Sequence, residues 1–208
     1  MGLFRKLVLQ MKISKLLAYS TLFFLFLSYN YSIANISSEF INNIASKASN
    51  ILSSQESEKL KMEKLIKIGQ QSVDIDGIGL YTLGKHRKGL NEDEKEEYKK
   101  IFREYFLKSF SSRLVEYKEA KIVVISEEVK NEKYTIVKSK LIATSSRPEI
   151  TIDWRVYTKD PLKPLIRDLI IEGLSLARTQ REEFNSIILN NNGDVHALFS
   201  SLKKFNKQ

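Results

Sequence analysis

The chain of 208 residues contains no cysteine, and this absence excludes several kinds of chemistry at once. Without thiols there is no disulfide framework, no cysteine nucleophile and no zinc site built from thiolates. The sequence also lacks a glycine-rich phosphate loop and a dinucleotide-binding fingerprint. Its two histidines, His86 and His196, lie in different regions without the spacing of a metal-binding motif. We therefore predict surface histidines, no metal and no cofactor.

The residues that are present describe a globular, basic protein. Hydrophobic residues make up 42% and charged residues 28%, which argues against a disordered chain or a polytopic membrane protein. The 34 lysines and arginines outnumber the 25 acidic residues and give a formal charge of +9. On a small protein such a charge suggests nucleic-acid binding. The charge is unevenly placed, however, and its position changes that interpretation.

The first 34 residues have the features of a secretory signal peptide. They carry four basic residues and no acid, then an apolar run from Leu16 to Leu27, then the small residues Ser32 and Ala34. We predict cleavage after Ala34 and a single domain at residues 35–208. The alternative is an uncleaved membrane anchor on an interaction domain, because residues 16–34 nearly reach the length of a membrane span. Removing the four basic residues from +9 leaves +5, and we predict no nucleic-acid partner.

The rest of the sequence predicts an α+β domain with helices first, then an antiparallel sheet, then helices. The first helix is expected at residues 36–52, and a second follows a polar turn at 53–56. Asp74 or Asp76 is expected to cap a short helix that ends near Gly84. A capping box at residues 91–94 begins the clearest amphipathic helix. Period-two patterns then predict strands at 121–126, 134–143, 149–157 and 165–171, with a turn at 127–133, and two helices begin near Gly173 and Asp194.

Residues 173–177, Gly-Leu-Ser-Leu-Ala, are similar to the nucleophile elbow of α/β-hydrolases. Ser175 would be the nucleophile, and Asp194 and His196 follow it in the chain order of that class. The fifth residue is alanine instead of glycine, and the 33 residues after Ser175 have helical patterns where that fold needs further strands. We favour a structural role for Ser175 at a helix start. An exported acyl hydrolase remains the enzymatic alternative.

The second half of the chain contains four segments, ITIDWRVY (150–157), RDLIIEGLSL (167–176), TQREEFNSII (179–188) and LFSSLKKF (198–205). Together they closely resemble the MlaC family of periplasmic phospholipid-binding proteins, also called the toluene-tolerance family. The most specific element is the run Asp168, Glu172, Gly173 and Ser175 beside the Trp-Arg strand at residues 154–155. Upstream, DIDGIGLYTL (74–83) is similar as well, so the resemblance covers about residues 37–205. The chain has Lys163 and Arg167 near the positions of an aromatic pair that is common in the family.

The resemblance implies an NTF2-like cone, in which helices pack on a strongly curved antiparallel sheet and enclose an apolar pocket. It implies a periplasmic carrier without catalytic residues, whose ligand is a phospholipid. Nothing in the sequence demands more than a monomer. Such a carrier would move lipid between an outer-membrane lipoprotein complex and an inner-membrane ABC transporter complex, and so maintain the lipid asymmetry of the outer membrane.

The apolar faces of the predicted elements supply the candidates for contact with the acyl chains. Glu172 and Ser175 are expected to be structural. The predicted lipid-binding residues are Ile78, Leu83, Phe102, Phe106, Phe110, Ile152, Trp154, Val156, Leu169, Ile171 and Leu174.

Overall fold

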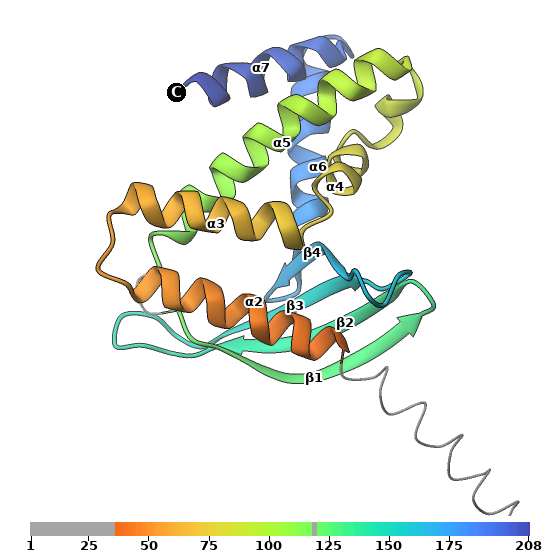
Figure 1. Ribbon diagram of the computed structural model, residues 1–208. Helices are drawn as coiled ribbons and strands as arrows, with labels where there is room; N and C mark the ends of the chain where they lie inside the picture. The colour runs from red at the N-terminus through yellow and green to blue at the C-terminus, as the bar shows by residue number, and fades with distance from the viewer. Residues whose placement is uncertain (1–35, 118–119) are drawn as a thin grey trace, which may run out of the picture. The chain divides into compact units, whose positions relative to one another are not determined.

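The computed structural model of the protein describes residues 36–117 and 120–208, so the predicted signal peptide lies outside the described residues. Residues 37–208 form one unit in which helices precede, and then follow, a curved antiparallel sheet (Figure 1). This confirms the predicted α+β class. The helical elements are α2 (Ile36–Ser53), α3 (Glu58–Ser72), α4 (Ile75–Thr82), the 3-10 helix η1 (Gly84–Lys88), α5 (Glu92–Leu114), α6 (Leu176–Asn190) and α7 (Val195–Lys207). The strands are β1 (Ile122–Asn131), β2 (Tyr134–Leu141), β3 (Ile150–Tyr157), β4 (Leu165–Ile171) and β5 (Leu174–Ser175).

Helices α3 to α7 begin at side chains that accept hydrogen bonds from the first free backbone amides, and the caps of α4 and α5 were predicted from the sequence. The Asn91 side chain caps α5 by accepting from the Glu94 amide, and the Glu94 carboxylate accepts from the Asn91 amide, which completes a capping box. Asp74 caps α4 by accepting from the Gly77 amide at 3.1 Å. The helix starts were predictable because each depends on residues three or four positions apart.

The sheet has the strand order β1-β2-β3-β4-β5, and every neighbouring pair is antiparallel. The prediction of a turn at residues 127–133 was wrong, because β1 continues to Asn131. Glu127 explains the difference: its carboxylate accepts from the Ser38 amide at 2.8 Å and from the Ser38 hydroxyl at 2.6 Å. The acidic residue therefore holds the first turn of α2 against the strand, which a local sequence pattern does not reveal.

One face of the sheet is closed by α2. Ile152, Trp154 and Val156 alternate along β3 as predicted and are buried together with Ile41 of α2. The indole nitrogen of Trp154 donates to the Ser139 hydroxyl at 2.8 Å, so its polar atom is satisfied inside this core. This face is a filled hydrophobic core.

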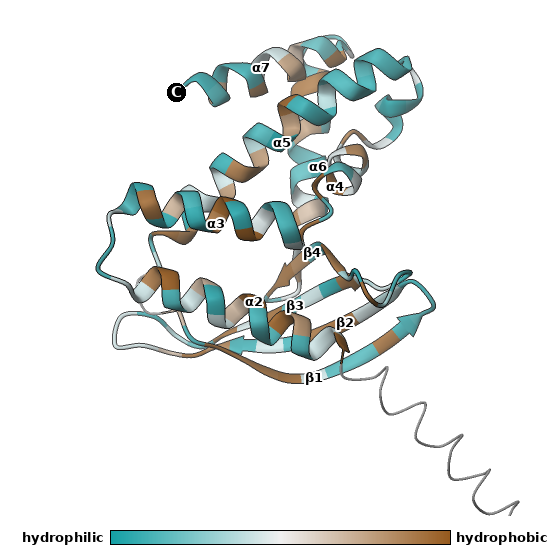
Figure 2. Cartoon of the chain, viewed as in Figure 1, coloured by the Kyte–Doolittle hydropathy of each residue, from teal (hydrophilic) through white to brown (hydrophobic). Residues whose placement is uncertain are grey.

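A second core lies among the helices α4 to α7. Phe102 of α5 approaches Gly79 of α4 so closely that a Cβ on that glycine would lie 2.7 Å from the ring. Tyr98 is fully buried beside it and shares a 2.9 Å hydrogen bond with Thr82. In Figure 2 the outer surfaces of α5 and α7 are largely hydrophilic, so the apolar side of each helix faces this core. Among residues 36–117 and 120–208, no helix has both the length and the apolar character needed to cross a membrane.

The helices and the sheet are joined at the end of α3. Val73 forms a parallel bridge with Ile166 of β4, and the Asp74 amide donates to the Ile166 carbonyl at 2.9 Å. The backbone between α3 and α4 is thus fixed to one strand. This junction positions α4 beside the face of the sheet that α2 leaves uncovered.

Candidate functional site

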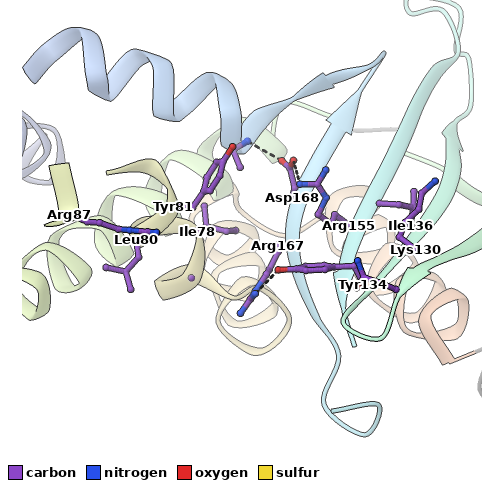
Figure 3. Close-up of a pocket in the computed structure, with 13 residues that line it drawn as sticks. Ile78, Leu80, Tyr81, Arg87, Lys130, Tyr134, Ile136, Arg155, Arg167 and Asp168 are labelled. Carbon is purple, nitrogen blue, oxygen red and sulfur yellow. Dashed lines mark hydrogen bonds and ion pairs between the residues drawn. The ribbon is translucent and has the colours of Figure 1, made fainter. Parts of the chain in front are cut away.

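A pocket of about 530 Å³ lies between α4 and the sheet, within the size range of small-molecule sites. Figure 3 shows Ile78 and Leu80 on the α4 side, with Ile136 and Arg155 on the strand side. Seven elements contribute to its wall: α4, η1, β1, β2, β3, β4 and α6. The lining residues are Gly77, Ile78, Leu80, Tyr81, Arg87, Lys130, Asn131, Tyr134, Ile136, Arg155, Arg167, Asp168 and Ala177.

The apolar part of the pocket comes from α4, β2 and the first turn of α6. Ile78, Ile136 and Ala177 are each less than a tenth exposed, and Leu80 is half-buried. These side chains offer a surface on which hydrocarbon can be removed from water. Tyr81 stands at the edge, 38% exposed, with the Arg181 guanidinium stacked over its ring.

Arg167 enters the pocket because of a β-bulge. Arg155 pairs with Asp168 and Val156 with Ile166, so Arg167 is the extra residue on β4. A bulge turns a side chain away from strict alternation. The bulge in β4 is therefore what gives Arg167 its position.

The guanidinium of Arg167 is held from three sides. Its Nε donates to Asp74 at 2.5 Å, one Nη donates to the Tyr134 hydroxyl at 2.7 Å, and the group stacks 3.6 Å from the Tyr157 ring centroid. Burial disfavours the charge, but the bonds to Tyr134 and Asp74 outweigh it and raise the pKa of Arg167. The cation is fixed, and only two of its five donor hydrogens are used by these partners.

Asp168 is the buried anion of the site, with its side chain 2% exposed. One carboxylate oxygen accepts from the Ser175 hydroxyl at 2.6 Å and the other from the Ala177 amide at 3.0 Å. Ser175 in turn accepts from the Arg178 amide at 3.1 Å and caps α6. The Arg155 guanidinium lies 3.8 Å from the carboxylate and is 46% exposed.

These contacts give the motif Asp168, Glu172, Gly173 and Ser175 a structural explanation. Glu172 and Gly173 form the turn between β4 and β5, both with positive φ (49° and 80°), which glycine adopts without strain. The Glu172 amide donates to the Thr151 carbonyl at 3.0 Å, and the Glu172 carboxylate accepts from the Thr151 amide. The motif therefore ends the sheet and starts α6.

Ser175 has no histidine among its hydrogen-bond partners, which matters for the hydrolase alternative. His86 bonds Asn185 at 2.9 Å, and His196 lies 3.2 Å from Glu94. The arrangement around Ser175 is that of a helix cap, not of a nucleophile with its base. Within the described part of the chain, no group of three histidine or acidic side chains gathers as a metal site requires.

Of the residues predicted to bind lipid, Ile78 is the one that lines this pocket. Leu83 and Phe102 are buried in the helical core, with Phe106 packed against it and Phe110 stacked on Phe106. Ile152, Trp154, Val156 and Leu169 belong to the core under α2. Ile171 is half-buried and Leu174 is 51% exposed. Contact of these residues with lipid stays a prediction.

The sequence analysis missed the polar residues of the pocket. Tyr134 and Arg155 line the pocket, and Tyr157 stacks on Arg167. All three fall on the strand positions opposite the buried ones, which an alternating pattern marks as solvent-facing. The available signal in the sequence was Arg167 itself, a cation beside Asp168 in an otherwise apolar strand. Nothing in the local pattern shows that α4 covers these positions.

Comparison with known proteins identifies the family of the chain and a solved structure with the same fold. The model of the MlaC protein family matches residues 35–204. A solved structure, the phospholipid-binding protein from Ralstonia solanacearum in complex with a phospholipid, superimposes with a TM-score of 0.67. It shares 15% sequence identity, and the alignment covers 82% of this chain and 96% of that one, so the likeness concerns the fold. No curated protein matches the chain. With a family model that spans most of its length and the same fold, the chain belongs to the MlaC family.

Proposed function

We propose that the chain is a phospholipid-binding carrier and that the pocket beside α4 is part of its lipid site. The observation that carries this proposal is the composition of the pocket wall. Hydrocarbon from Ile78, Leu80 and Ile136 stands beside the cations Arg155 and Arg167 in one cavity. An amphiphile with an apolar tail and an anionic group has the matching chemistry.

Two comparisons support the ligand class. The family to which the chain belongs is that of the MlaC protein, and the similar protein from Ralstonia solanacearum was solved with a phospholipid bound. Ser175 has the contacts of a helix cap, which favours a carrier over the acyl-hydrolase alternative.

A carrier must cover the acyl chains but can leave the headgroup in water. Each methylene exposed to water costs about 0.8 kcal/mol, so two chains of some thirty methylenes would cost on the order of 20 kcal/mol. That cost makes free phospholipid in water negligible. A cavity beside a helix that is joined to the sheet at one end, as α4 is at Asp74, offers such cover.

We propose further that the protein is exported and works in the periplasm. The basic, acid-free start and apolar run of residues 1–34 support cleavage of a signal peptide. In that compartment the carrier would pass phospholipid between an outer-membrane lipoprotein complex and an inner-membrane ABC transporter complex. Maintenance of outer-membrane lipid asymmetry is the process that this exchange would serve.

Substitution in the apolar wall tests the carrier function. Leu80→Asp places a charge in the pocket at a half-buried position, and we expect the purified protein to lose most of its bound phospholipid. Leu189→Asp is the matched control, because Leu189 is 55% exposed on α6 and lies outside the pocket. Phosphorus analysis of extracted lipid, with circular dichroism to verify folding, measures the effect. Equal lipid content in folded Leu80→Asp and wild-type protein would contradict the proposal.

A further inference from the structure

The strand side of the pocket contains a cluster of hydrogen-bond donors that the fold does not fully use. We propose that Arg155, Arg167 and the Tyr134 hydroxyl bind the phosphate of the lipid headgroup. The inference rests on the proposed function and adds to it the part of the ligand that is recognised. Its basis is the arrangement of these three side chains on adjacent strands.

The three residues are neighbours in the sheet. Tyr134 is on β2, Arg155 on β3 and Arg167 on β4, and all three line the same cavity. The bulge places Arg167 next to the Arg155–Asp168 pair. Figure 3 shows the Arg167 and Tyr134 side chains pointing toward one another, with Arg155 next to Asp168. A ligand group in the cavity can therefore meet donors from three strands.

Each member retains donor capacity. Arg167 uses its Nε for Asp74 and one Nη hydrogen for Tyr134, which leaves the other Nη group available. The Tyr134 oxygen accepts this bond, and among residues 36–117 and 120–208 no acceptor takes the Tyr134 hydroxyl hydrogen. Arg155 is 46% exposed and stands 3.8 Å from Asp168, too far for a direct hydrogen bond.

The site is ordered before any ligand enters. Asp74 and the Tyr157 ring fix the Arg167 guanidinium, so little side-chain freedom is lost on binding. The two Asp168 oxygens accept hydrogen bonds from the Ser175 hydroxyl and the Ala177 amide, so this carboxylate is held at the start of α6. Guanidinium groups match the oxygens of a phosphate in geometry and charge.

A phosphodiester is the group that this cluster fits best. Asp74 and Asp168 offset the charges of Arg167 and Arg155, so these two arginines alone make no large net positive field, although Arg87 and Lys130 also line the cavity. Recognition depends instead on several directed donors around one tetrahedral group. The apolar residues Ile78 and Leu80 in the same cavity indicate a phosphate that is attached to a lipid, not a free ion.

Short-chain lipids with and without a phosphoglycerol headgroup test this site. Delipidated wild-type protein is titrated by calorimetry with dihexanoyl phosphatidylglycerol, dihexanoylglycerol and inorganic phosphate. Because a hydrogen bond with a charged group changes affinity by about tenfold or more, we expect the phosphatidylglycerol to bind at least about tenfold more tightly than the dihexanoylglycerol. Arg155→Gln and Tyr134→Phe should each reduce this ratio, whereas Lys138→Gln, an exposed residue on the same face of β2 but outside the pocket, should not.

The outcomes separate the two proposals. Equal affinity of the wild type for both lipids would overturn the phosphate site and leave the carrier function intact. Binding of neither lipid would contradict the carrier function. Inorganic phosphate that binds as tightly as the phosphatidylglycerol would overturn the assignment to a lipid headgroup. Tyr134→Phe removes a single oxygen atom, so a changed ratio in this folded variant supports the site even if Arg155→Gln is unstable.

Discussion

Removal of the buried carboxylate at Asp168 should destabilise the protein strongly. In Asp168→Ala the Ala177 amide and the Ser175 hydroxyl lose their acceptor, in a position whose side chain is only 2% exposed. Water has little access to replace the lost partner. The first turn of α6 would then be held by Ser175 alone, through its bond with the Arg178 amide.

The size of the effect follows from these contacts. A buried donor without an acceptor costs roughly 1–3 kcal/mol, and two donors are affected, although the Ser175 hydroxyl can rotate to another acceptor. The half-exposed Arg155 adds little, because ion pairs in contact with water contribute about 0–1 kcal/mol. We expect a loss of about 3 kcal/mol in the free energy of unfolding. For a unit of this size each kcal/mol lowers the melting temperature by roughly 2–4 °C, so a decrease of about 9 °C is expected.

Thermal and urea unfolding followed by circular dichroism measure this loss. Asp168→Asn is the matched control: its amide oxygen can still accept from the Ala177 amide, so it should lose clearly less stability. Ser175→Ala, which removes the helix cap and the hydroxyl that donates to Asp168 but leaves the Asp168–Ala177 bond, should cost about 1 kcal/mol. If Asp168→Ala costs less than 1 kcal/mol, or no more than Ser175→Ala, the assigned role of Asp168 in holding α6 is wrong.

Two further predictions concern the helical core. Gly79→Ala would bring a Cβ within 2.7 Å of the Phe102 ring and should lower the free energy of unfolding, measured by chemical denaturation, by about 1–3 kcal/mol. The control Gly89→Ala, whose Cβ would have its nearest neighbour at 3.7 Å, should be close to neutral. Equal effects of the two substitutions would contradict the close packing of α4 and α5. Burial raises the pKa of the Tyr98 phenol above its ordinary value of 10.0, so unfolding free energy should fall as the pH rises above 10, where only the unfolded phenol ionises. Tyr98→Phe should weaken this fall in stability with rising pH, and an unchanged pH dependence would contradict the raised pKa of Tyr98.

The elements that were predictable from the sequence depend on short-range patterns. The capping box of Asn91 and Glu94 is a contact between residues three apart, and the burial of alternate residues on β3 follows from the two-residue period of a strand. The extension of β1 through Glu127 was missed because it depends on Ser38, which is 89 residues away in the chain. Such a contact leaves no trace in the local sequence.

The candidate site was less predictable for a related reason. Apolar spacing identifies residues that avoid water, but it does not separate a filled core, such as the one around Phe102 and Val156, from a cavity wall such as Ile78. The polar half of the pocket depends on the bulge at Arg167, which changes the direction of one side chain relative to its strand. Convergence of Tyr134 and Arg167 is a property of the folded sheet.

Native mass spectrometry of the protein purified from its own cells, without detergent, tests the central claim most directly. The account predicts a folded protein that carries phospholipid, and lipid extraction should identify that ligand. It also predicts that Leu80→Asp reduces the lipid-bound fraction while Leu189→Asp leaves it unchanged. A folded wild-type protein that carries no phospholipid, and takes up none from added vesicles, would contradict the account.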